Sequence, residues 1–595
     1  MVRRLVSRRS WRRRAILTAI ISCAVLLLLS LAHSLGAYSF GERERVLIVG
    51  AGAAGLAAAA SLSGHASVLV LEAQERVGGR VHTNRSLGVP VEFGAAWIHR
   101  AEGNVVSELA HQFGCSTFVS ENKRLVVHGE RGQQIGAATV TSVYNLLTRK
   151  LMPQLLSRRK ELRLDGRDDV SMGVLMARGL SELSSVWSPT KRCVLDFLLF
   201  RDIVQDHTAD LEQTSAARYD TDHYGGNGKD HVLPGGYDCI IQGLQRQAGL
   251  QVHAPARLDE VRSSGDVAQL RGSMQRSARA HRREARGSAL AEGIRLAEAG
   301  EVVELRWGED GVRALLADGS IEHADRAIVT APLGVLKASI HQSARGGMAD
   351  RADGHGRADG HGRSASRALA FDPPLPSNVR LAIERLGYGE ALKVALRFPH
   401  VFWPVEAHFI GKVGGRCDQL GSARHMEFLN VAKYADGAPV LLMETETENA
   451  RTLSALSDEQ VVQTVVDELR KMYGHGVVPQ PTGAVVARLN NNSFQRGGFS
   501  FMPTGGTHEL HRILATPLAN GRLVLAGEHA SSLHAGTVHG AIVSGRRAAA
   551  HVKAAIRRAD VLAAGEDYEE AYKATLFRTI YSEDDDGEEE WDRNP

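Results

Sequence analysis

The sequence predicts an α/β fold, and this prediction rests on three neighbouring features of residues 45–72. Residues 46–49 are apolar and mostly β-branched, as expected for a parallel strand that is buried on both faces. A glycine-rich turn at 50–55 follows directly, and an alanine-rich segment of high helix propensity continues from it. Residues 67–71 form a second apolar run, which ends in Glu72. Strand, turn, helix and strand in this order predict the βαβ unit of a nucleotide-binding sheet.

The turn has the spacing GxGxxG, and each of its small residues has a physical reason. Gly50 permits the tight turn, Gly52 lets the backbone approach a pyrophosphate, and Gly55 lets helix and strand pack closely. Ala53 and Ala54 begin the helix, whose free N–H groups and positive dipole end would face the phosphates. A glycine-rich turn without a ligand is the alternative, and the flanking strand and helix argue against it. The segment therefore predicts a dinucleotide site.

The residues after the second strand add a second glycine motif, which by itself could be a simple turn with a solvated arginine. Glu72 is placed to accept hydrogen bonds from an adenosine ribose, and Ala73 begins the segment that follows. Gly78, Gly79 and Arg80 provide a second backbone approach and a planar donor fork for phosphate or flavin carbonyl groups. Together the two motifs resemble the signature of the flavin-containing amine oxidase superfamily, which includes polyamine oxidases, monoamine oxidases and lysine-specific histone demethylases. The resemblance implies a Rossmann-like FAD-binding domain with an interleaved α+β substrate domain, built from a mixed sheet and helices.

Composition narrows the possible functions. The chain has 595 residues and is 43% hydrophobic, which is enough for two sizeable cores. Its 71 Lys and Arg against 68 Asp and Glu argue against a role on nucleic acid. The cysteines are Cys23, Cys115, Cys193, Cys239 and Cys417. Because they show no regular spacing, they give no support for a metal site, and they leave disulfides open.

Residues 1–42 predict a signal for the secretory pathway. Seven arginines precede an apolar run at 15–32, so the rest of the chain would cross the membrane. Small residues at Ser30 and Ala32 favour a cleaved signal peptide, whereas the length of the run favours a single-pass signal anchor. The two alternatives stay open. With a signal anchor, the catalytic domain would be lumenal or extracellular. With a cleaved signal peptide, it would be secreted.

Applied along the chain, the resemblance predicts two domains whose segments alternate. The FAD-binding domain is expected to comprise residues 43–115, 225–338 and 485–558, and the substrate domain residues 116–224 and 371–484. Two insertions are expected, at 263–293 and at 339–370. A C-terminal segment with an acidic tail covers 559–595. Helices are expected at 105–113, 143–156, 191–203 and 238–247. The second insertion repeats the hexapeptide Arg-Ala-Asp-Gly-His-Gly in tandem. Such a segment has almost nothing to bury, so we expect it to be disordered.

The resemblance also assigns FAD contacts far from the first motif. Residues 91–99 match the segment that leads to the flavin ring, and a strand is expected at 522–526. A long helix begins near residue 536, and its positive dipole end would stabilise negative charge on the reduced ring. The further residues that the resemblance places at the cofactor are Gly94, Ala95, Trp97, Val302, Gly527, Glu528, Thr537 and Val538.

Lys393 is the candidate catalytic residue. It lies inside the apolar strand at 391–396, where a lone lysine is costly. A lysine at the edge of the sheet, with its ammonium in solvent, is the alternative from the residues alone. The resemblance instead places Lys393 on the lysine that holds a water molecule against flavin N5.

The substrate pocket departs from the family pattern. The resemblance places His99, Phe494, Phe499 and His534 at this pocket, where the aromatic cage around the substrate amine is incomplete. Monoamine oxidases carry a cysteine, bonded to the flavin, where this sequence has Phe499. We therefore expect FAD to be bound non-covalently.

These residues imply an FAD-dependent amine oxidase that most resembles polyamine oxidases. The α-carbon of the amine would deliver hydride to flavin N5, and O2 would be the acceptor, giving aldehyde, amine and H2O2. Three alternatives remain open. They are a histone demethylase, a desaturase of the same fold that acts on a different substrate, and a non-catalytic FAD-binding protein whose site has decayed.

Overall fold

The strand predicted at 46–49 is β1 (Arg45–Val49), which lies within a six-stranded parallel sheet. The computed structural model describes residues 43–121, 124–155, 157, 169–181, 188–219, 228–253, 293–344, 368–415 and 424–564. The strand order is β23 (Leu523–Leu525), β14 (Arg326–Val329), β1, β2 (Ser67–Glu72), β10 (Gly293–Leu296) and β9 (Val252–His253). Neighbouring strands in this order pair in parallel. The expectation of a parallel strand at 46–49 is therefore confirmed.

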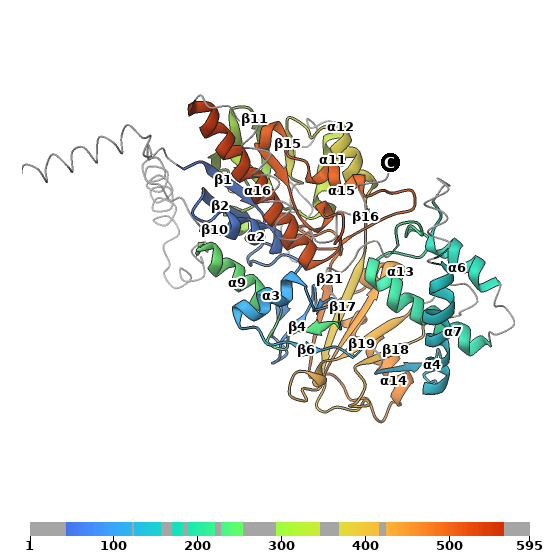
Figure 1. Cartoon of the computed structure of the whole chain (residues 1–595). Helices are drawn as coiled ribbons and strands as arrows, with labels where there is room; N and C mark the ends of the chain where they lie inside the picture. The colour runs from blue at the N-terminus through green and yellow to red at the C-terminus, as the bar shows by residue number, and fades with distance from the viewer. Residues whose placement is uncertain are drawn as a thin grey trace, which may run out of the picture. The chain divides into compact units, whose positions relative to one another are not determined.

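Both faces of this sheet are covered, because alternate side chains of β1 enter two different cores. Val46 and Ile48 belong to the core that includes Leu56 of α2 (Ala53–Leu62). Leu47 and Val49 belong to the core on the opposite face. On the first face, α2 packs against α16 (Val538–Ala564) and α9 (Asp238–Ala248), and Figure 1 shows α2 and α16 side by side next to β1 and β2.

A four-stranded sheet and two helices surround the second core. The strand order is β13 (Ile321–Ala324), β12 (Gly311–Leu316), β11 (Val302–Gly308) and β15 (Ala370–Asp372), and the helices are α11 (Leu333–Ala344) and α12 (Ser377–Arg385).

The predicted boundaries of both insertions are wrong at their ends. Helix α11 continues to Ala344, and Ser339 and Leu369 are buried, so the insertion predicted at 339–370 is too wide. Gly293 is the first residue of β10 and pairs with Leu69. In each case tertiary packing extends a regular element into a stretch whose composition looked loop-like. Residues 254–292 and 345–367 lie outside the described residues, so the expectation that the tandem repeat is disordered stays a prediction.

A six-stranded mixed sheet carries Lys393. Its strand order is β21 (Gly483–Arg488), β17 (Ala391–Arg397), β20 (Val440–Glu446), β19 (Met426–Asn430), β18 (Phe409–Lys412) and β7 (Leu125–His128). The helices beside it are α4 (Ala137–Leu146), η1 (Leu147–Leu151), α6 (Met172–Ser181), α7 (Pro189–Leu199), η3 (Phe200–Val204), α13 (Thr447–Ser454) and α14 (Asp458–Tyr473). Figure 1 shows this sheet with α4, α6 and α7 on one side.

The remaining elements are short and connect these sheets. They are α3 (Val105–Phe113), α8 (Gln205–His207), α15 (Glu509–Ala515), β3 (Thr83–Asn84), β4 (Val91–Glu92), β5 (Trp97–Ile98), β6 (Phe118–Val119), β8 (His231–Val232), β16 (Gly387–Tyr388), β22 (Ser500–Phe501), η5 (Ala297–Ala299), η6 (Val431–Lys433), η7 (Ala519–Gly521) and η8 (Glu528–Ala530). The helices predicted at 105–113 and 238–247 are α3 and α9, while α4 with η1 and α7 with η3 occupy much of the other two predicted ranges. Mixed helices and sheets of this kind confirm the α/β class.

A disulfide joins Cys115, just after α3, to Cys239 in α9, and it closes a separation of 124 residues. The sequence had left this pairing open. The segment predicted to be a membrane signal lies outside the described residues. Within the part of the chain that the structure describes, no helix combines the length and the apolar character needed to cross a membrane.

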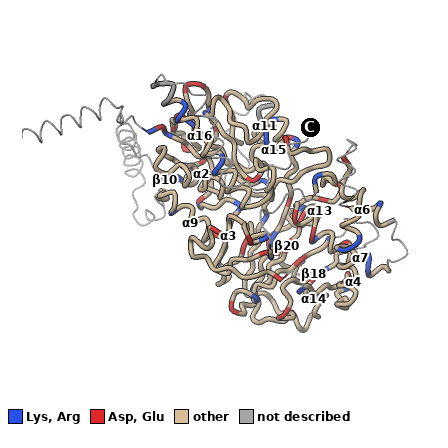
Figure 2. Tube along the Cα trace, viewed as in Figure 1, with Lys and Arg blue, Asp and Glu red and all other residues tan. Residues whose placement is uncertain are grey.

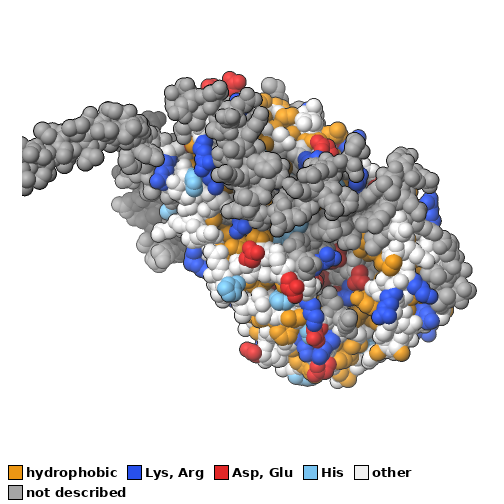
Figure 3. Space-filling model, in the orientation of Figure 1, with side chains coloured by type: hydrophobic (Ala, Val, Ile, Leu, Met, Phe, Trp, Pro, Cys, Tyr) orange, Lys and Arg blue, Asp and Glu red, His pale blue; other side chains and the backbone are white. Residues whose placement is uncertain are grey.

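Charges of both signs are spread over the described chain. Basic and acidic residues are scattered over the trace in Figure 2. On the face that Figure 3 shows, basic, acidic and hydrophobic side chains are likewise interspersed.

Candidate active site

A cavity of about 580 Å³ lies where the parallel sheet, the long helix α16 and the mixed sheet meet. The predicted residues that line it are Gly50, Gly52, Ala53, Ala54, Glu72, Ala73, Gly79, Arg80, Gly94, Ala95, Trp97, His99, Val302, Lys393, Phe494, Phe499, Gly527, Glu528, Thr537 and Val538. Two predicted residues are not in this wall. Gly55 lies behind the glycine turn, where an added Cβ would be 2.0 Å from the Gly50 carbonyl oxygen, so its role is close packing. The His534 ring lies 4.9 Å from the ring of His539, which does line the cavity.

The glycine motifs form one end of the cavity. The second motif lies against the first, because the Gly78 N–H donates to the Ala51 carbonyl at 2.8 Å. Helix α2 begins here with Gly52 as its N-cap, with no side-chain cap and no acidic residue in its first turn. An added Cβ at Gly52 would have nothing closer than the Gly78 carbonyl oxygen at 3.8 Å, so space is open beside this backbone. Uncapped N–H groups that face open space fit a phosphate group.

Glu72 is held rigidly at the same end. The Ala51 N–H donates to Oε2 and the Gln74 N–H donates to Oε1, both at 2.8 Å. Burial raises the pKa of Glu72, and the two backbone donors oppose that rise. Each carboxylate oxygen can accept more than one hydrogen bond. The geometry therefore leaves acceptor capacity at Glu72 for hydroxyl groups of a ligand.

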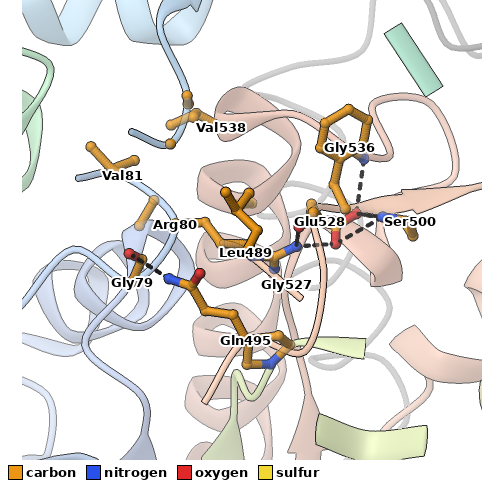
Figure 4. A pocket seen from close by; sticks show the side chains of 18 of the residues that line it. Gly79, Arg80, Val81, Leu489, Gln495, Ser500, Gly527, Glu528, Gly536 and Val538 are labelled. Atoms are coloured by element: carbon orange, nitrogen blue, oxygen red, sulfur yellow. Dashed lines mark hydrogen bonds and ion pairs between the residues drawn. The ribbon is translucent and has the colours of Figure 1, made fainter. Parts of the chain in front are cut away.

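Glu528 joins the second glycine motif to the C-terminal segments at Ser500 and Gly536, as Figure 4 shows. Its Oε1 accepts from Arg80 Nη1 at 2.6 Å, and its Oε2 accepts from the Gly536 N–H at 2.8 Å and from the Ser500 hydroxyl. Arg80 Nη1 also donates to the Gly498 carbonyl oxygen at 3.1 Å. Burial alone would raise the pKa of Glu528, but the Arg80 guanidinium and the other donors hold it at about 2. Both oxygens of the Glu528 carboxylate thus accept hydrogen bonds from protein groups. These bonds hold the second glycine motif against the segment that leads into α16.

Lys393 is a paired cation, and the expectation of a lone lysine is wrong. Its ammonium donates to Glu444 Oε1 at 2.6 Å and to the Gly94 carbonyl oxygen at 2.9 Å, and it lies 5.8 Å from the centre of the Trp97 ring. Lys393 and Glu444 are direct partners in the antiparallel register of β17 and β20. Gly94 is needed here because an added Cβ would be 1.7 Å from the Arg80 carbonyl oxygen. Lys393 therefore reaches the cavity wall between a carboxylate and the segment predicted to lead to the flavin ring.

The wall beside Lys393 is acidic, which the sequence analysis did not predict. Five carboxylates line it, namely Asp202, Asp206, Glu427, Glu444 and Glu446, against the cations Arg201 and Lys393. Glu444 and Glu446 lie on one face of β20 because they are two residues apart, and Glu427 of β19 pairs directly with Glu444. In the sequence, the alternating Glu-Thr-Glu of β20 could have indicated two carboxylates on one face of a strand. Only the strand register shows that Glu427 lies beside them.

Two of these carboxylates are poised to exchange protons near neutral pH. Burial raises the pKa of Glu427 to about 7, although Arg201 Nε donates to its Oε2 at 2.7 Å. Desolvation by the surrounding protein also raises the pKa of Asp206, which lines the cavity, to about 7, and the charge of Asp202 adds to this rise. Among the described residues, no group of three or more His, Cys, Asp or Glu is arranged to hold a metal ion.

The residues fit FAD, since the open helix end, the acceptor at Glu72 and the long cavity agree with the needs of a dinucleotide. The family model described as flavin containing amine oxidoreductase matches residues 53–286 and 271–553. The chain therefore belongs to the flavin-containing amine oxidoreductases. It is an FAD-dependent amine oxidase, and the family predicted from the two glycine motifs is confirmed.

Curated relatives belong to two branches of this family. The chain is 28% identical over 535 residues to polyamine oxidase 4 of Oryza sativa subsp. japonica. This match covers 85% of the chain and 87% of the relative. It is 27% identical over 512 residues to polyamine oxidase 5 of the same organism, with 84% and 86% covered. It is also 27% identical over 571 residues to lysine-specific histone demethylase 1 homolog 3 of Arabidopsis thaliana. That match covers 89% of this chain but 30% of the demethylase.

Proposed function

We propose that this protein is a polyamine oxidase-like enzyme, with FAD bound non-covalently by a Rossmann-like arrangement of the parallel sheet. Bound FAD would supply the two-electron oxidation of a C–N bond, with O2 as the acceptor and aldehyde, amine and H2O2 as products. The observation that carries the proposal is the acidic wall beside Lys393, where five carboxylates face two cations. The relatives named polyamine oxidases, whose lengths this chain nearly spans, support it.

Charge decides between polyamines and simple monoamines. Arg201 pairs with Glu427 and also with Asp202 at 3.5 Å, and Lys393 pairs with Glu444, so the five carboxylates of the wall outnumber its two basic side chains. Charges inside a protein interact strongly because the effective dielectric constant is lower than that of water. A polyamine carries several ammonium groups and can neutralise this excess, whereas a monoamine supplies one. The wall therefore favours a substrate with at least two positive charges.

Anaerobic mixing of the holoenzyme with spermidine or butylamine tests this proposal. We expect spermidine to bleach the visible flavin absorbance at least about 10-fold more efficiently, which corresponds to about 1.4 kcal/mol. Spermidine binding should weaken from about pH 8 to about pH 6, because Glu427 and Asp206, each with a pKa of about 7, take up protons. Equal efficiency for the two amines would contradict the proposal. Acid precipitation of the same holoenzyme should leave the yellow colour in solution, since Phe499 cannot form a thioether.

We also propose that the catalytic region resides in an oxidising compartment, secreted or held by a single membrane anchor through the segment at 1–42. The disulfide between Cys115 and Cys239 supports this location, because disulfides persist where the environment is oxidising. Translation of the full chain with microsomes should protect the catalytic region from added protease. Complete digestion with intact microsomes would contradict the proposal.

A further inference from the structure

Glu446 is a buried carboxylate whose second oxygen has no partner. It is the last residue of β20, is 4% exposed and belongs to the wall of the large cavity. Its Oε2 has no hydrogen-bond partner among the residues that the structure describes. An unsatisfied carboxylate oxygen inside a protein is costly unless a proton or a cation meets it.

Two basic side chains, Arg201 and Lys393, share the acidic wall of the large cavity with Glu446, and both are already engaged. Arg201 Nε binds Glu427 at 2.7 Å, and Lys393 Nζ binds Glu444 at 2.6 Å. Within the described chain, neither forms an ion pair with Glu446. Glu427, Glu444 and Glu446 therefore share two basic side chains. Glu427 and Glu444 each form an ion pair with one of them, and among the described residues Glu446 forms none with either.

The position of Glu446 is set by the fold. Next in the chain, Thr447 has a φ of 53°, an uncommon conformation for a β-branched residue, and its N–H donates to the Glu390 carbonyl oxygen at 3.0 Å. Burial raises the pKa of Glu446 well above its ordinary range, and Glu444 adds to this rise while Lys393 and Gln205 oppose it. The carboxylate is thus held where it lacks only a charge partner.

We infer that Glu446 anchors a second ammonium group of a diammonium substrate whose other amine is oxidised beside Lys393. This inference rests on the proposed function and names the specificity-determining residue of the same site. An ammonium group fits better than a metal ion, since the described residues hold no metal-type cluster. It would donate a charge-assisted hydrogen bond to the Glu446 carboxylate and supply the countercharge that the protein lacks.

Two probes of equal length isolate the second charge. Diaminooctane and octylamine share the same carbon chain and differ by one ammonium group. Calorimetric titration of the oxidised holoenzyme should show the diamine binding about 10-fold more tightly. Glu446→Gln should reduce this ratio to about one by weakening only the diamine. Glu448→Gln is the matched control, since Glu448 lies two residues away, is exposed and pairs with Arg451, and it should keep the ratio.

The outcomes separate this inference from the proposed function. If the unaltered enzyme is reduced by spermidine and prefers the diamine, but Glu446→Gln keeps that preference, the inference is wrong and the proposed function stands. If Glu446→Gln removes the preference in an enzyme that spermidine does not reduce, the subsite is real and the proposed function is wrong. Absence of any preference in the unaltered enzyme overturns the inference.

A second variant covers the case in which Glu446→Gln fails to retain its flavin. Glu446→Asp keeps the charge and withdraws it by one methylene group. The preferred diamine should then become longer when a series of chain lengths is titrated. An unchanged optimum would overturn the inference.

Discussion

Replacement of Glu528 by Gln should lower the free energy of unfolding by about 3 kcal/mol and release most of the bound FAD. The carboxylate accepts from Arg80, Ser500 and Gly536, so its loss leaves the Arg80 guanidinium without its countercharge. It also frees the second glycine motif from the start of α16. Urea unfolding and the flavin content of the purified protein measure the two effects.

The control for this variant is Glu509→Gln. Glu509 is an exposed carboxylate of α15 that pairs with Arg512 at 3.1 Å, and surface pairs contribute little to stability. Its replacement should change neither unfolding nor flavin content. If Glu528→Gln behaves like this control, Glu528 does not hold the cofactor site together.

The same carboxylate should make stability depend on pH. Its pKa of about 2 in the folded protein lies below the ordinary value of 4.5, so the unfolded chain binds more protons between these values. The stabilisation from Glu528 is therefore complete above about pH 4.5 and is lost as the pH falls toward about 2. It amounts to on the order of 3 kcal/mol. The unaltered protein should lose stability more steeply in this window than Glu528→Gln, and equal slopes would contradict the assignment.

Replacement of Lys393 by Met should lower both stability and flavin turnover. Removal of the ammonium leaves Glu444 buried without its partner at 2.6 Å, which we expect to cost about 3 kcal/mol. It also removes the only charged group that donates to the Gly94 carbonyl oxygen in the described structure. Rapid-mixing absorbance separates reduction by amine from reoxidation by O2, and we expect the reoxidation rate to fall most.

A double variant distinguishes chemistry from packing. Lys393→Met combined with Glu444→Gln removes both charges, so no buried carboxylate is left unpaired and most of the stability should return. Turnover should stay slow, because the ammonium group is still absent. If turnover recovers together with stability, Lys393 is a structural residue and its catalytic assignment is wrong.

The first βα unit was predictable because its signals are local. The apolar run at 46–49, the glycine spacing at 50–55 and the alanine-rich helix each act within a few residues. The resemblance carried by Arg80 and by the C-terminal segment then led to the family. By contrast, α11 continues to Ala344 and packs against α12 and β15, whereas composition alone had assigned residues from 339 onward to an insertion.

By itself, the sequence determined the cofactor class and the family, since glycine turns and their flanking elements are written in contiguous residues. Only the tertiary structure decided the charge of the substrate wall. Lys393 and Glu444 are 51 residues apart, and Arg201 and Glu427 are 226 residues apart. Antiparallel register and the packing of η3 against the mixed sheet bring these groups together, and no local pattern encodes either. The missing charge partner of Glu446 follows from the same register, because its direct neighbour on β17 is the uncharged Ala391.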